Sequence, residues 1–205
     1  MRRNTTIVLV ILGAWFGLAL AAGMSGPFHN ATAPMVAITV WTLTGIALLI
    51  CWIIPGARNW AAIVDLQWLV GLHLTRFVGV YFLLLGSRGA LPQGFARTAG
   101  IGDIIVAAAA GSILLIPELR RRKILIIWNS MGLIDIVFVV FSAMRFGLRD
   151  WLSMAPLREL PLSLLPTFLV PLIIASHILI FIRLARTPIG PITPAQHLSA
   201  AVLRK

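Results

Sequence analysis

The chain has 205 residues, of which 60% are hydrophobic and 11% are charged, and its mean hydropathy is +0.98. This composition excludes a soluble globular domain and predicts a protein whose solvent is the lipid bilayer. The net charge of +11 does not indicate nucleic-acid binding, because the basic residues lie in short segments between apolar runs. The single cysteine, Cys51, excludes an intrachain disulfide and a cysteine-based metal cluster.

Six apolar stretches approach the roughly 20 residues that a spanning helix needs. They cover residues 7–24, 35–54, 60–86, 98–116, 124–144 and 162–182. No linker or low-complexity segment is long enough to separate domains. We therefore expect an all-α, polytopic transmembrane bundle of six helices that forms a single domain over residues 1–205.

The first stretch follows Arg2 and Arg3 and contains Ala19-Leu20-Ala21, a sequence that a signal peptidase accepts. Its apolar run is longer than most signal cores, which favours a retained helix over a cleaved one. Gly13, Gly17 and Ala21 recur every four residues and form a stripe on which a second copy or a membrane partner can pack closely.

Basic residues in the connecting segments predict the orientation of the bundle. Of the 17 lysines and arginines, 11 fall on the side of the amino terminus, five fall on the other side, and Arg76 lies inside a span. The tetrad from Arg120 to Lys123 contributes most to this asymmetry. Because cytoplasmic loops carry the excess of basic residues, both termini are predicted to be cytoplasmic.

The third span carries a guanidinium near its centre. At 100° per residue, Asp65, His73 and Arg76 fall within an arc of about 80° on one helical face. Asp65 lies near the inner boundary, whereas the other two lie deeper. A lone arginine at this depth costs about 3 kcal/mol on insertion scales, so pairing or hydration of Arg76 is expected.

Acidic and neutral polar side chains lie at matching depths in other spans. Arg76 and Asp135 come out slightly towards the outer side, Asp103 about one turn farther out, and Asn129 and His177 about one turn inward. Pairing of Arg76 with Asp103 or Asp135 is therefore possible, although Asp103 can equally interact with the dipole of its own helix start. The predicted binding or charge network comprises Arg76, Asp103, Asp135, His177, His73 and Asn129. A purely structural network remains open.

Prolines at positions 161, 166 and 171 predict a kink in the sixth helix, with Pro166 and Pro171 as its hinge. The latter two remove the helical donors for the carbonyls of Leu162 and Thr167. In lipid these carbonyls must be satisfied, either at a water-filled vestibule or by neighbouring helices.

A set of short motifs resembles a group of bacterial hypothetical membrane proteins that have no known function. These motifs are Arg76, Gly89-Ala90-Leu91-Pro92, Phe95-Ala96, Gly100-Ile101-Gly102-Asp103, Trp128-Asn129, Gly132-Leu133-Ile134-Asp135, Leu160-Pro161, Pro166, Val170-Pro171 and His177. The likeness covers the third to sixth spans but not the first two. It implies a bacterial six-span protein and no activity. We expect the chain to lie in the bacterial cytoplasmic (inner) membrane as a multi-pass protein.

Three functions stay open from the sequence. A transporter would receive a small anionic or zwitterionic solute at Arg76 and exchange a proton at Asp135 or His177. A non-catalytic subunit of a larger membrane complex would use the small-residue stripe. A b-type haem protein would hold iron between His73 and His177, although no cofactor is our main expectation. No metal-binding or catalytic motif indicates an enzyme.

Overall fold

The computed structural model describes residues 2–24, 26, 28, 30–116 and 118–186, with only the backbone of residues 2 and 118–121. Helices are the only regular secondary structure in these ranges. The long helices are α1 (Arg2–Met24), α2 (Ala33–Ile53), α6 (Gln93–Leu114), α7 (Glu118–Arg149) and α8 (Val170–Arg186). The shorter elements are α3 (Pro55–Ile63), α4 (Leu66–Leu72), η1 (His73–Val78), α5 (Gly79–Ser87), η2 (Leu152–Arg158) and η3 (Leu165–Leu169).

Six helical segments are long and apolar enough to cross a membrane. They are Arg3–Met24, Ala33–Ile53, Leu66–Ser87, Gln93–Leu114, Arg122–Arg149 and Leu165–Arg186. The predicted all-α fold class with six membrane-spanning helices is therefore confirmed. The cytoplasmic location of both termini stays a prediction.

The third span differs at its start from the expected range of 60–86. Pro55 opens a separate short helix, α3, which ends where Val64 adopts an extended conformation with ψ of 138°. Asp65 then caps α4, because its carboxylate accepts a hydrogen bond of 2.9 Å from the backbone N–H of Gln67. The Asp65 carboxylate is therefore bonded to the backbone at the start of α4, and it takes no part in the site described below.

The centre of the third span is wound as a 3-10 helix from His73 to Val78. In this winding, side chains three residues apart eclipse each other, so His73 and Arg76 project from the same line along the helix. Both side chains are buried, with 0% and 1% exposure. The local tightening thus directs two polar side chains into the same part of the bundle.

The fourth helix begins earlier than expected, at Gln93, because Pro92 stands at its N-cap position. Asp103 therefore lies well inside α6 and away from its first turn. The suggestion that Asp103 interacts with the start of its own helix is wrong for this reason. Its carboxylate is free to pair with another span.

The prolines of the sixth span change the helix geometry as expected. Residues from Leu165 to Leu169 form a turn of π-helix, and α8 continues from Val170. The carbonyl of Leu162 accepts a hydrogen bond of 3.0 Å from the N–H of Leu165. The carbonyl of Thr167 accepts one of 2.9 Å from the indole nitrogen of Trp15 on α1. Protein donors, rather than a wet vestibule, therefore satisfy both carbonyls.

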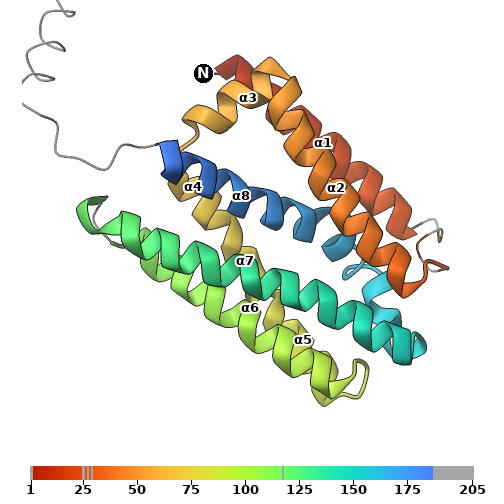
Figure 1. Cartoon of the computed structure of the whole chain (residues 1–205). Helices are drawn as coiled ribbons and strands as arrows, with labels where there is room; N and C mark the ends of the chain where they lie inside the picture. Colours follow the sequence, from red (N-terminus) through yellow and green to blue (C-terminus); the bar gives the residue numbers. More distant parts are fainter. Residues whose placement is uncertain (1, 25, 27, 29, 117, 187–205) are drawn as a thin grey trace, which may run out of the picture.

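The helices are arranged around α8 (Figure 1). The pair α1 and α2 lies on one side of α8, and the group α5, α6 and α7 lies on the other. Within the window that defines each span, 61% of the sixth span is buried but only 17% of the first. The sixth span is therefore the central helix, and polar side chains on several of its faces point into protein.

Two ends of the bundle serve as reference points below. At the η2 end, the indole nitrogen of Trp151 donates to the carbonyl of Ala31, which places η2 beside the start of α2. At the α3 end, Gly56 packs against Ile7, which places α3 beside the start of α1. These two ends correspond to the two membrane surfaces of the predicted bundle.

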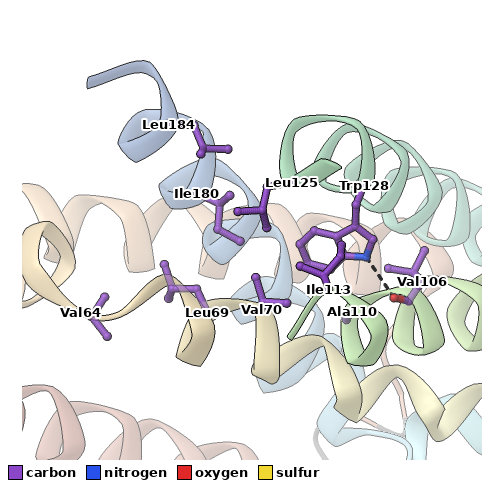
Figure 2. Packing of buried hydrophobic residues seen from close by; sticks show 10 residues of the cluster. All are labelled: Val64, Leu69, Val70, Val106, Ala110, Ile113, Leu125, Trp128, Ile180 and Leu184. Atoms are coloured by element: carbon purple, nitrogen blue, oxygen red, sulfur yellow. Dashed lines mark hydrogen bonds between the residues drawn. The ribbon is translucent and has the colours of Figure 1, made fainter. Parts of the chain in front are cut away.

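A core of aliphatic side chains around Trp128 fills the α3 half (Figure 2). It joins the third span to α6, α7 and α8, and its members are Val64, Leu69, Val70, Val106, Ala110, Ile113, Leu125, Trp128, Ile180 and Leu184. The indole nitrogen of Trp128 donates a hydrogen bond of 3.1 Å to the carbonyl of Val106. This contact fixes α7 against α6 next to the polar residues of the site.

Candidate functional site

Arg76 is the centre of the site, and each of its three guanidinium nitrogens has an acceptor. Nε donates to Oδ1 of Asp103 at 2.7 Å, and Nη1 donates to the carbonyl of Gly132 at 3.1 Å. Nη2 forms an ion pair with Oδ2 of Asp135. The expected pairing of Arg76 is therefore present, and it involves both carboxylates rather than one. We refer to Arg76, Asp103 and Asp135 as the charge triad.

The two carboxylates of the charge triad differ in their surroundings. The Asp103 side chain is 5% exposed, whereas that of Asp135 is 21% exposed. Asp103 projects from α6 into the interior, and Asp135 lies at the seam between α7 and α6. Asp135 is therefore the more exposed of the two carboxylates.

Glycines bring the three helices close enough for these contacts. A methyl group on Gly79 would lie 2.4 Å from the carbonyl oxygen of Gly100, so the third span and α6 touch backbone to backbone. A methyl group on Gly102 would lie 2.1 Å from Oδ1 of Asp135. These glycines leave the space in which the guanidinium and its partners fit.

His177 is held by an amide on the neighbouring helix. Nδ2 of Asn129 donates to the carbonyl of His177 at 3.0 Å, so Oδ1 of Asn129 is the free acceptor. This oxygen lies 2.8 Å from Nδ1 of His177 and accepts a hydrogen bond from it. His177 therefore carries a proton on Nδ1, and in the neutral ring its Nε2 carries a lone pair.

His73 is held by Ser176 of the central helix. The Ser176 hydroxyl donates to the carbonyl of Ile173 at 2.8 Å and lies 3.0 Å from Nε2 of His73. With the single hydroxyl proton directed at the Ile173 carbonyl, Nε2 of a neutral His73 is the donor and its Nδ1 carries the lone pair. The rings of His73 and His177 pack together with centroids 4.2 Å apart. We call these two rings the histidine pair.

Two cavities flank the polar residues. The η2-end cavity has a volume of about 70 Å³, is lined mainly by apolar side chains, and reaches Arg76 and Asp103. The α3-end cavity has a volume of about 220 Å³ and is also apolar, with Ser176 in its lining. Polar groups of the site therefore meet a cavity on each side.

The six residues singled out from the sequence are brought together. Arg76, Asp103 and Asp135 bond to one another, and Asn129, His73 and His177 form the adjacent part of the network. Sequence reasoning missed Ser176 and the carbonyl of Gly132. Ser176 is adjacent to His177 in the chain, and only the burial of α8 on several faces brings both side chains into the interior.

The histidine pair does not fit a haem between its rings. At a centroid separation of 4.2 Å, the rings contact each other, and a porphyrin between them would require them to move apart. Among the described residues, no group of three or more histidine, cysteine or carboxylate side chains is placed to hold a metal ion.

Comparison with known proteins gives a family but no relative of established activity. No curated protein matches the chain, and no solved structure matches it. A family model described as "Domain of unknown function (DUF8737)" matches residues 33–185. This range includes the second span, which the resemblance noted from the sequence did not cover, and every residue of the charge triad and the histidine pair. The chain therefore belongs to the DUF8737 family.

Proposed function

We propose that the charge triad is the proton-coupled binding site of a membrane transporter for a small anionic or zwitterionic solute. The observation that carries this proposal is that one guanidinium, buried in the spanning helices, is shared by two carboxylates. We further propose a bacterial cytoplasmic membrane as the location of this transporter.

The formal charges of the triad do not cancel. One guanidinium and two carboxylates give +1 − 2 = −1 when all three groups are ionised. An uncompensated charge inside a bilayer is costly, and binding of one proton removes it. A structural ion pair needs only one carboxylate, so the second one supports a role in proton binding.

Asp135 is the carboxylate that we assign to the exchanging proton. Its side chain is more exposed than that of Asp103, and it contacts the end of the guanidinium at Nη2. Protonation of Asp135 weakens this ion pair and leaves Nη2 available. The carboxylate of a solute then takes the vacated place, while Asp103 still holds Nε.

This order of events couples the solute to the proton. Before protonation, an anionic solute would add a third negative charge to a site that already has a surplus. After protonation, the site is neutral and the guanidinium accepts an anion. The η2-end cavity of about 70 Å³ has room for a few water molecules or a very small group, which limits the size of the solute near Arg76.

Proton movement in reconstituted vesicles tests the proposal. Purified protein in proteoliposomes that contain a pH-sensitive dye is exposed to a panel of small carboxylates and amino acids at the outside. We expect a subset of them to accelerate acidification of the lumen. Asp135→Asn should abolish this acceleration, because the amide neither binds nor releases the proton.

The matched control is Asp150→Asn, which changes an exposed aspartate at the end of α7 that accepts backbone N–H groups of the next turn. This variant should behave as the wild type. Absence of any solute-dependent proton movement in the wild type, or an unchanged rate in Asp135→Asn, would assign the triad a structural role only.

A second candidate function is that of a subunit in a larger membrane complex. Gly13 and Gly17 lie on the outer surface of α1, and a methyl group on either would meet nothing within 4 Å. The space beside them is thus open to another helix. Purification in mild detergent that yields only this chain, as a monomer, would contradict this candidate.

A further inference from the structure

We propose that the histidine pair and Ser176 form a relay that carries a single proton between the charge triad and the α3-end cavity. This inference rests on the proposed function and extends it to residues that the coupling at Asp135 does not use. It begins from two buried nitrogen atoms, Nδ1 of His73 and Nε2 of His177, that have no hydrogen-bond partner.

Both nitrogens are acceptors in the arrangement that the neighbours impose. Oδ1 of Asn129 accepts a hydrogen bond from Nδ1 of His177, and the Ser176 oxygen accepts one from Nε2 of His73. Each ring therefore keeps one nitrogen lone pair without a hydrogen-bond donor. Both side chains are 0% exposed, so these lone pairs are buried. A buried acceptor without a donor is uncommon, and at a functional site a proton is the simplest group that satisfies it.

The histidine pair can bind one additional proton but not two. Two imidazolium rings with centroids 4.2 Å apart would repel each other strongly in a medium of low dielectric constant. Of the charged groups on the elements packed around the pair, Arg76 on η1, Asp103 on α6 and Asp135 on α7 form the adjacent triad, and α2 and α4 carry none. The other described charged residues of α6, α7 and α8 lie towards the ends of these helices. A single proton on the pair is balanced by the surplus negative charge of the triad.

The polar groups lie in series between the two cavities, joined partly by hydrogen bonds and partly by packing contacts. Arg76, which reaches the η2-end cavity, bonds to the carbonyl of Gly132. A methyl group on Gly132 would lie 3.0 Å from Nε2 of His177, so the bare nitrogen faces this glycine. His177 packs on His73, and His73 bonds to Ser176 at the α3-end cavity.

Each transfer in the relay conserves protons. A proton held at Nε2 of His177 passes to the lone pair at Nδ1 of His73, which returns His177 to neutral and makes His73 cationic. His73 returns to neutral when its Nε2 gives its own proton to the Ser176 oxygen. The hydroxyl at the same time passes its proton to a water molecule in the α3-end cavity. The transfer leaves His73 neutral with its proton on Nδ1, and a turn of the hydroxyl restores the hydrogen bond from Ser176 to the Ile173 carbonyl.

The protonation states are tested on the unmodified protein. The full chain is labelled with ¹⁵N-histidine in lipid nanodiscs, and the ring nitrogens are followed by NMR as the pH is lowered. We expect His73 to start with the proton on Nε2 and His177 with the proton on Nδ1. As the pH is lowered, the ¹⁵N signals of both rings should change in a single titration step, in which the histidine pair gains one proton. Two separate steps that end in two cations, or no proton uptake while the protein stays folded, would overturn the proposal.

The relay is tested by vesicle proton flux in two variants. His73→Gln and Ser176→Ala should slow the flux by about a hundredfold, because a positioned proton-transfer group contributes on that order. Ser130→Ala is the control, since Ser130 bonds only within its own helix and lies outside the site. Wild-type flux with unchanged rates in both variants refutes the relay and leaves the proposed function intact. No flux in the wild type refutes the proposed function itself.

Discussion

His177 packs directly on the α-carbon of Gly132. A methyl group at that position would lie 2.6 Å from Cε1 of His177 and 3.1 Å from Cγ1 of Val106. The carbonyl of the same glycine accepts the hydrogen bond from Nη1 of Arg76. One residue without a side chain thus allows the guanidinium and the imidazole to share a small volume.

Gly132→Ala should therefore destabilise the protein by about 1 to 3 kcal/mol, the usual range for adding a methyl group to a packed interior. Gly45→Ala is the matched control, because Gly45 is also inside a spanning helix and a methyl group there meets nothing within 4 Å. Thermal unfolding of both variants in the same detergent is the measurement. Equal unfolding temperatures for the two would mean that His177 moves aside at no cost.

Removal of charge from the triad should show whether Arg76 is needed for folding or for function. Arg76→Gln alone leaves two carboxylates without their partner and should cost about 3 to 5 kcal/mol. The triple variant Arg76→Gln, Asp103→Asn, Asp135→Asn has no charge to compensate and should recover most of this stability. It should still show no solute-dependent proton flux. A triple variant that unfolds as readily as the single one would contradict this account of the ion pairs.

The hydrogen bond from the Trp15 indole should stabilise the protein because Pro171 has no N–H to donate to the Thr167 carbonyl. Trp15→Phe removes the donor to the Thr167 carbonyl and leaves a ring beside Phe168, so we expect a loss of about 1 to 3 kcal/mol. In the Pro171→Ala background, the alanine N–H supplies a helical donor to that carbonyl, and Trp15→Phe should cost much less. A double-mutant cycle of unfolding free energies measures the coupling. Trp52→Phe, at an indole that is 76% exposed, should have almost no effect.

Asp65 should stabilise the start of the third span as a helix cap. Asp65→Ala removes the acceptor for the Gln67 N–H and should cost about 0.5 to 2 kcal/mol, whereas Asp65→Asn keeps a capping oxygen and should cost little. Unfolding of the two variants by denaturant provides the comparison. Neither change should alter proton flux, because Asp65 lies outside the charge triad. A loss of flux in Asp65→Asn would mean that the boundary aspartate also handles protons.

Much of the site was predictable because helix periodicity and depth constrain residues that lie far apart in the sequence. The rise per residue placed Arg76 and Asp135 at similar depth, and the cost of a buried guanidinium required a partner. Both arguments apply to any spanning helix, whatever its neighbours. The ion pairs of Arg76 follow directly from them.

Local winding was less predictable than helix position. If the third span is treated as one uniform α-helix, Asp65 lies on the same face as His73 and Arg76. In the structure the chain breaks at Val64, Asp65 caps the start of α4, and the 3-10 turn from His73 changes the angle between His73 and Arg76. Hydrophobic periodicity does not register such changes, because apolar residues occupy most positions on all sides of this span.

Contacts that depend on how helices pack were not predictable from one sequence. Ser176 lies next to His177, and an ordinary helix would direct the two side chains to different surroundings. Burial of α8 among the other helices places both in protein. The hydrogen bond from Trp15 to Thr167 likewise joins residues 152 positions apart. Only the assembled bundle shows which donor reaches which carbonyl.

The bond between Trp15 and Thr167 also bears on how the family can vary. Trp15 precedes residue 33, where the family match begins. Its indole nevertheless donates to the Thr167 carbonyl in place of the N–H that Pro171 lacks. A homologue reduced to the matched region would leave a bare carbonyl facing hydrocarbon. We therefore expect an amino-terminal tryptophan and the later proline to be inherited together and lost together.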